Sequence, residues 1–168
     1  MERIYSKLKA IEDMASKMNG ISVECGVFPE DGSKEETVTI LNLDDTTTEI
    51  KMNVADIMFF TQYGTISLPP RPIFENLRRE IELPLRLTVK KCLSNMMESQ
   101  NFNSAYVISE LEVLQNRINN EIIPKVIQNI LAQNSTIANI LEVKDETPYL
   151  FDLNKLKKYI KCKIFFKS

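Results

Sequence analysis

The chain has 168 residues, of which 43% are hydrophobic and 26% charged, and its net charge is −2. This composition excludes a wholly disordered chain, and the length is sufficient for one domain with a substantial hydrophobic core. The apolar runs are too short to cross a bilayer, and the N-terminus lacks the layout of a signal peptide. We therefore expect a protein that stays in the cytosol or is assembled there into something larger.

The charges are unevenly distributed along the sequence. The first 60 residues contain 6 Lys and Arg against 12 Asp and Glu, whereas the remainder contains 15 against 11. An acidic front and a mildly basic back suit head-to-tail contact between subunits, or a face turned towards a polyanion. Ordinary solvated faces explain the same counts equally well.

The residues that usually carry catalysis are missing or scattered. Histidine is absent, and Cys25, Cys92 and Cys162 lie so far apart that we expect free buried thiols rather than a disulfide framework or a zinc site. The four glycines form no phosphate-binding loop, and Asp44-Asp45 has the character of a turn rather than of a calcium loop. We predict that the chain is not an enzyme and binds no cofactor and no metal, with carboxylate catalysis as a third alternative.

The first third of the chain alternates between helical and extended patterns. The expected elements, in chain order, are a helix over 3–18 that ends at Gly20, a strand over 21–28, a turn over 29–33, and a hairpin of strands 37–43 and 47–52 joined at 44–46. Gly26 lies inside the first strand, where glycine is typical of a bulge.

A short helix is predicted over 54–63, because apolar residues again recur at helical spacing. Asn53 is its expected N-cap and Gly64 its left-handed stop. The chain from 68 to 72 must be extended, since proline fixes its own φ and disfavours helix at the preceding residue.

A long amphipathic helix is predicted to follow Pro72, a residue that suits the first turn of a helix. Its apolar stripe consists of Phe74, Leu77, Ile81, Leu85, Val89, Cys92 and Met96. Pro84 lies within this stripe, so we expect a kink or break near Leu83.

A further amphipathic helix is predicted over 104–132, with a kink or restart at Pro124 and a polar turn over 134–136. The C-terminal segment should form a helical turn that Asp152 caps and that runs through Leu156. A half-buried strand then follows from residue 160, because Ile160, Cys162 and Ile164 alternate with lysines.

These elements define the fold class. A strand this late in the chain most naturally returns to the N-terminal sheet. We therefore predict a single α+β domain over 1–168, in which a small, mostly antiparallel sheet packs against long amphipathic helices.

The C-terminal segment also concentrates positive charge among aromatic side chains, a combination that can follow a phosphate backbone and stack on bases. The lysines that would face DNA are Lys157, Lys158, Lys161 and Lys163. The same pattern also fits the exposed face of a strand, where lysines block edge-to-edge association. Non-specific electrostatic contact with DNA is the most that we expect.

The stretch from Tyr63 to Phe74 combines a glycine turn, three prolines and one cation between two helical patterns. Arg71 lies between two prolines, so its backbone has little freedom and its guanidinium can form a two-pronged pair with a carboxylate. Two interpretations stay open. Arg71 contacts a neighbouring subunit or partner, or it clamps the linker internally onto the preceding helix.

This stretch resembles the neck or tail-completion proteins of long-tailed bacteriophages, a family also called phage virion morphogenesis proteins and related to the minor tail protein Z group. That family has an aromatic-Gly-Thr turn, a short spacer and an Ile-Pro-Ala-Arg-Pro-Phe segment that opens a long helix. The matching residues are Tyr63, Gly64, Thr65, Pro69, Arg71, Pro72 and Phe74, with Pro70 in place of the family's small residue.

Three flanking stretches fit in the same order. Residues 23–29 resemble the family's early Val-x-Val-Gly-aliphatic-Phe strand, and 134–137 resemble a Ser-x-x-Thr-Ile-like segment. Residues 148–156 resemble a Pro-Leu-Ile-Asp-Thr-Gly-x-Leu segment, but Leu153 and Asn154 stand at its Thr and Gly positions. The match is therefore weaker at this end, although Asn tolerates the left-handed backbone of a glycine.

The resemblance implies a structural protein of a phage neck or tail, a tail-completion or head–tail joining subunit in a homo-oligomeric ring around the DNA channel. Its partners would be connector or portal-side, terminator and tail-tube proteins, and it would reside in the virion after assembly in the host cytoplasm, without membrane contact. The implied interface residues are Tyr63, Gly64, Thr65, Pro69, Pro70, Arg71, Pro72 and Phe74. A tail terminator or another connector-ring subunit is the alternative within this class, and a cytosolic DNA-associated regulatory module is the alternative from another class.

Overall fold

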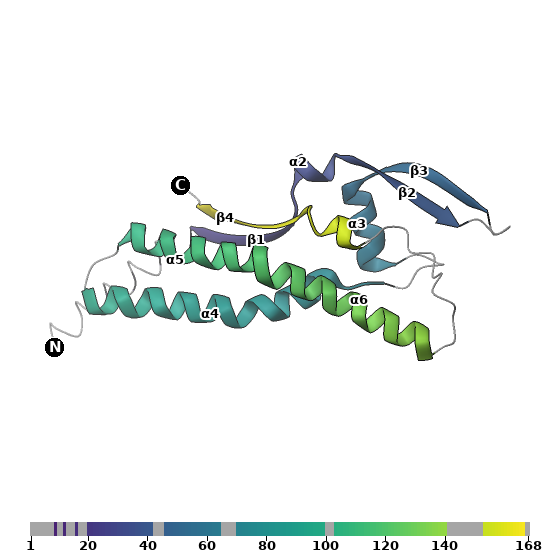
Figure 1. Cartoon of the computed structure of the whole chain (residues 1–168). Coiled ribbons are helices and arrows are strands. Elements are labelled where there is room, and N and C mark those ends of the chain that lie inside the picture. Colours follow the sequence, from purple (N-terminus) through teal and green to yellow (C-terminus); the bar gives the residue numbers. More distant parts are fainter. Residues whose placement is uncertain are drawn as a thin grey trace.

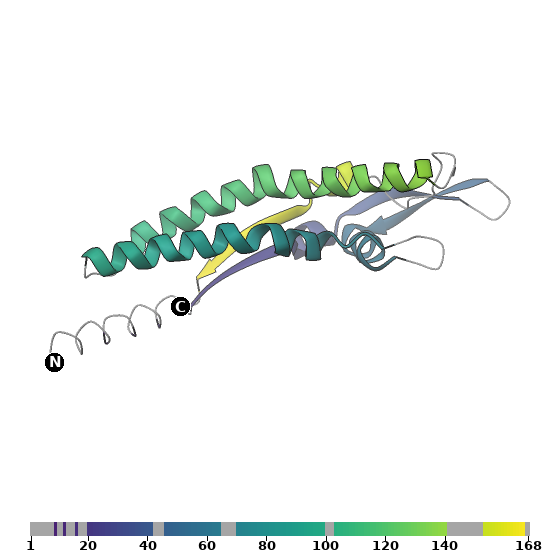
Figure 2. The same ribbon diagram turned by 90° about the horizontal axis from the view of Figure 1, so that it is seen from below.

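A pair of long antiparallel helical rods carries the small sheets of this protein on one side (Figure 1). The computed structural model describes residues 9, 12, 16, 20–41, 46–64, 70–99, 103–140 and 153–166. At 40, 41, 133–140 and 166 it describes the backbone alone. The first rod is α4 (Ile73–Ser99), and the second is α5 (Ser104–Arg117), the π-helical turn η1 (Ile118–Ile122) and α6 (Ile123–Ile140). Figure 2 shows the two rods side by side.

The first and last strands of the described chain pair with each other. β1 (Ile21–Val27) runs antiparallel to β4 (Ile160–Phe166), which confirms that the late strand returns to the N-terminal one. Their seven residues pair one to one, with Gly26 opposite Lys161. A bulge needs an extra residue in one strand, so the predicted bulge at Gly26 is wrong.

The predicted hairpin forms a second, separate sheet. β2 (Glu35–Leu41) pairs antiparallel with β3 (Thr47–Asn53), while Asp44 and Asp45 of its turn lie outside the described residues. The described residues thus confirm the α+β class, with two two-stranded antiparallel sheets where one small sheet was expected. The predicted turn after β1 takes the form of a single helical turn, α2 (Pro29–Gly32), since proline at the first helical position loses no backbone bond.

The short helix α3 (Val54–Tyr63) follows the hairpin directly and confirms the predicted range. Gly64 ends it with φ of 77°, and its N–H donates to the Phe60 carbonyl at 2.9 Å. Asn53 occupies the N-cap position but makes no side-chain capping bond. The first N–H of the helix, that of Val54, donates instead to the Lys34 carbonyl at 2.9 Å.

Helix α4 runs unbroken through Pro84, so of the predicted kink or break near Leu83 the break is wrong. All members of its predicted stripe are buried or half-buried, on both sides of the proline. Proline removes one backbone hydrogen bond, but packing of the stripe before and after it holds both halves of the helix along the second rod.

The second rod contains the π-helical turn η1, which ends two residues before Pro124. A π turn inserts one extra residue into a helix, and at this point it accommodates a proline that cannot donate a backbone bond. The predicted restart at Pro124 therefore takes the form of a widened turn. The polar turn predicted over 134–136 is wrong, because α6 continues to Ile140 and extending an existing helix needs no new nucleus.

The core consists of two clusters. The larger one joins α3, α4, the second rod, β4 and the short helix α7 (Leu153–Leu156), and includes Ile57, Leu77, Ile127 and Leu156. The smaller one lies where α4 ends and α5 begins, and contains Cys92, Met96, Val107 and Leu111. Among the described residues, no helix has the length and apolar character needed to cross a membrane.

Three predicted features fall largely or wholly outside the described residues. Of the helix predicted over 3–18 only Lys9, Glu12 and Ser16 are described, and all three are helical. Residues 141–152, which include the predicted cap Asp152, and residues 65–69 of the proline-containing linker are not described.

Candidate functional site

The junction between α3 and α4 contains the described members of the predicted interface, with Thr65 and Pro69 outside the described residues. The chain re-enters α4 through backbone bonds that tie it to α3. The Arg71 N–H donates to the Thr61 carbonyl at 2.8 Å, and the Ile73 N–H donates to the Arg71 carbonyl at 2.7 Å. The linker thus returns to the end of the helix that it left.

Gln62 fastens this junction with both ends of its amide. Its Oε1 accepts from the Phe74 N–H at 3.1 Å, and its Nε2 donates to Glu75. An N–H in the first turn of α4, which has no partner within the helix, is therefore capped from α3. Gln62 was not among the residues predicted to contact a partner. The available signal was its spacing, because Gln62 stands four residues after the buried Met58 and so occupies a core position.

Arg71 is the buried cation of the junction, with 6% of its surface exposed. An isolated subunit does not present this guanidinium to a partner. Of the two interpretations of Arg71, burial favours the internal clamp. Pro70 and Pro72 on either side are exposed.

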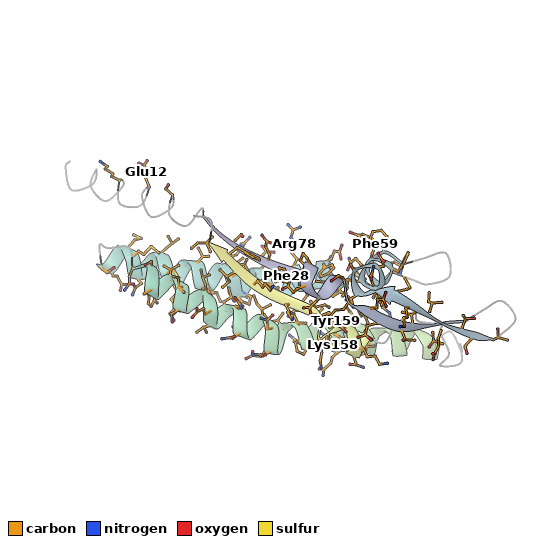
Figure 3. The ribbon with its side chains drawn as sticks, turned by 90° about the horizontal axis from the view of Figure 1, so that it is seen from above. Glu12, Phe28, Phe59, Arg78, Lys158 and Tyr159 are labelled. Carbon is orange, nitrogen blue, oxygen red and sulfur yellow. The ribbon has the colours of Figure 1, made fainter. Side chains whose placement is uncertain are left out.

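The accessible part of the junction is an aromatic patch, which we define as Phe59 and Tyr63. Both side chains are exposed, Tyr63 by 65%, and their ring centroids lie 5.0 Å apart. Phe59 also contacts Phe60 edge-on, at 5.9 Å between centroids. Figure 3 shows Phe59 on α3, away from Lys158. Large exposed rings that rest on each other are typical of protein interfaces.

A shallow groove of about 460 Å³ lies between β1 and α4. It is lined by Val23, Cys25, Phe74, Leu77, Arg78, Ile81, Glu82 and Leu85. Phe74, the last residue of the predicted interface, is half-buried here and belongs to the groove rather than to the aromatic patch.

Three of the four lysines predicted to face DNA contact carboxylates from the N-terminal half. Lys161 lies 2.5 Å from Asp31, Lys158 lies 2.8 Å from Glu36, and Lys163 pairs with Glu30. The fourth, Lys157, is exposed. Figure 3 shows Lys158 beside Tyr159, whose hydroxyl donates to the same Glu36 carboxylate. We call this set of pairs the lysine face.

Asp31 is the centre of the lysine face. Its side chain is buried and also pairs with Lys34 at 2.6 Å. Hydrogen bonds from Lys161 and then Lys34 lower the pKa of Asp31 to about 2. The bond to Glu36 raises the pKa of Lys158 to about 12, and the bond from Lys158 lowers the pKa of Glu36. Part of the acidic front is thus neutralised by the basic back within the chain.

In the described part of the chain, no three His, Cys, Asp or Glu side chains gather in a way that could hold a metal ion. A comparison with protein-family models, curated proteins and solved structures finds no match to this chain. A functional assignment therefore depends on the sequence motif and on the geometry of the residues that carry it.

Proposed function

We propose that this chain is a structural protein of a bacteriophage neck or tail, a subunit of the tail-completion or head–tail joining ring. The observation that carries the proposal is the Tyr63–Phe74 motif. Its glycine ends α3 at positive φ, its arginine is buried beside α3, and its Pro72 directly precedes α4. The positive φ at Gly64 favours glycine, and the position before the helix suits proline, the residue types that the resembling family has there.

The role proposed is geometric rather than catalytic. The internal bonds of Gln62 and Arg71 fix the direction in which α4 leaves α3. The aromatic patch then remains on the surface, where it can contact a neighbouring subunit or a connector, terminator or tail-tube protein. In a closed ring one such contact is repeated by symmetry, so modest interfaces add up to a stable assembly.

The charges support a contact with DNA that is non-specific at most. Lys158, Lys161 and Lys163 already have carboxylate partners in the same chain, which leaves less positive charge for phosphates. The DNA-associated regulatory module therefore gains no support from the described residues. A tail terminator or another connector-ring subunit stays as the alternative, because the same junction would serve it equally.

Purified phage particles provide the direct test. Mass spectrometry should detect this chain in mature particles, and cryo-electron microscopy should place it in a ring between head and tail. Density in a terminator layer would favour the alternative within the class. Absence of the chain from mature particles would overturn the proposal.

A substitution in the aromatic patch tests which surface makes the contacts. Tyr63→Ala should reduce incorporation of the chain into particles, since truncation of an interface aromatic residue costs roughly 1–2 kcal/mol per contact and the ring repeats the loss. The matched control is Val113→Ala on α5, because Val113 is similarly exposed, at 62%, but lies on another element. Equal incorporation of both variants would contradict an interface at the patch.

A further inference from the structure

Two cysteines far apart in sequence are brought together by the pairing of the first and last strands. Cys25 of β1 lies directly opposite Cys162 of β4. Both side chains belong to the sheet face that packs against the larger core cluster. Sequence spacing gave no indication of this pair, since only the antiparallel register creates it.

The backbone shows which kind of cross-strand pair this is. The Cys162 N–H donates to Asn119 Oδ1 at 2.7 Å, and Asn119 Nδ2 donates to the Cys162 carbonyl at 3.2 Å. Both backbone groups of Cys162 therefore point towards η1 and away from β1. Cys25 and Cys162 consequently form a non-hydrogen-bonded pair, in which Cα atoms approach to about 4.5 Å. That separation lies within the range of disulfides, whose Cα atoms are about 4.4–6.8 Å apart.

The two thiols are in contact and differ in their surroundings. The hydrogen bond from the Cys162 thiol lowers the pKa of Cys25, and the same bond together with burial raises the pKa of Cys162. Cys25 lines the groove between β1 and α4 and is half-buried, whereas Cys162 is 1% exposed. Cys25 therefore combines a lowered pKa with access from the groove, and Cys162 lies directly opposite it on β4.

We propose that Cys25 and Cys162 are an oxidation site that reacts with hydrogen peroxide and closes into a disulfide between β1 and β4. The Cys25 thiolate attacks a peroxide oxygen, the O–O bond breaks, and Cys25 becomes a sulfenic acid while hydroxide leaves and takes up a proton as water. The Cys162 sulfur then attacks the Cys25 sulfur, the S–O bond breaks, and a second water leaves with the Cys162 proton. The two thiols lose two electrons and the peroxide gains them.

Closure would change the molecule without requiring a new fold. The bond ties the first described strand to the last, so it closes a loop that contains both helical rods. A disulfide across such a long loop stabilises mainly by restricting the unfolded chain. The oxidised protein should therefore unfold at a higher temperature than the reduced one, and dithiothreitol should reverse the rise. This site is independent of the role proposed for the α3–α4 junction.

The test uses the full reduced chain treated with hydrogen peroxide, followed by denaturation and alkylation of the remaining thiols. The expected product has one alkylated cysteine, Cys92, and yields on digestion a peptide pair joined through Cys25 and Cys162. In Cys162→Ala the sulfenic acid should persist at Cys25 and be captured by dimedone. In Cys25→Ser no disulfide and no trapped sulfenic acid at Cys162 should form.

Cys92→Ser is the matched control, since Cys92 is buried in the smaller cluster and should not affect the reaction. Circular dichroism checks that each variant folds, and Cys25→Ser keeps the test decisive if the buried Cys162→Ala variant does not. Three alkylated cysteines in the treated wild type would overturn the proposal. A disulfide that joins two chains or involves Cys92 would overturn it as well.

Discussion

The α3–α4 junction and the lysine face were both predicted to contact partners, and they differ in how much of their surface stays available to a partner. At the junction, a glycine, the flanking prolines and the buried Gln62 amide fix the backbone, and the aromatic patch remains exposed. On the lysine face, three predicted ligands of DNA are paired with carboxylates of the same chain. The junction thus retains surface for a partner, whereas the lysine face has used much of its charge internally.

The comparison shows which residue types carry information before the fold is known. Glycine at positive φ and proline before a helix act on their own backbone, so their effect is local. The effect of a lysine depends on which charges the fold places beside it. The residues that neutralise Lys158 and Lys161 lie more than a hundred positions earlier in the sequence, in α2 and β2.

The largest effect is expected at Gln62. Gln62→Ala should lower the free energy of unfolding by about 1–3 kcal/mol, because the Phe74 N–H and the Glu75 carboxylate both lose a buried partner. Urea unfolding followed by circular dichroism measures the change.

The neighbouring Tyr63→Ala is the control, since Tyr63 is exposed and its loss should change stability by no more than about 0.5 kcal/mol. Equal losses in the two variants would show that Gln62 does not fasten the junction. Tyr63→Ala would then need to be reassessed as a probe of assembly alone.

A smaller effect is expected at Gly64. Gly64→Ala should cost about 1–2 kcal/mol, since a Cβ disfavours the φ of 77° that ends α3. Gly64→Asn should cost about as much, because ψ of −178° places Gly64 outside the left-handed region that asparagine tolerates. The same urea titration compares the two, and a stability for Gly64→Ala equal to that of the wild type would contradict strain at this position.

Local sequence patterns predicted most of the elements. The ranges of β1, β3 and α3, the apolar stripe of α4 and the return of β4 all followed from periodicity and from end signals such as Gly64. The failures at Pro84 and at 134–136 have one physical cause. In both places, residues that disfavour a helix were predicted to interrupt one, although a long helix that is already formed tolerates them.

The candidate sites were less predictable, since they depend on contacts that periodicity does not encode. Gln62 reaches across a linker to α4, and Asn119 reaches from η1 to the edge of β4. The pairing of Cys25 with Cys162 requires the register of two strands at opposite ends of the chain. A polar residue at a core spacing of an apolar helical face, such as Gln62 four residues after Met58, was the one signal present in the sequence.

The smallest effect at neutral pH is expected on the lysine face, because the ammonium groups that hold Asp31 are largely exposed, by 56% for Lys34 and 44% for Lys161, and solvent screens them. The pH dependence is the sharper readout. The folded pKa of Asp31, about 2, lies below the unfolded value of about 3.9, so its contribution is present above about pH 4 and is lost as the pH falls through about 2.

Asp31→Asn should therefore be less stable than the wild type at pH 7, and the difference should shrink as the pH falls towards 2. Urea midpoints measured across this range, with Lys161→Met and the double variant, separate the pair from other effects of each substitution. A constant difference between wild type and Asp31→Asn at every pH would mean that the charge of Asp31 does not stabilise the fold. Lys161 and Lys34 would then owe less to their intramolecular partner, and the contrast between the lysine face and the junction would lose part of its basis.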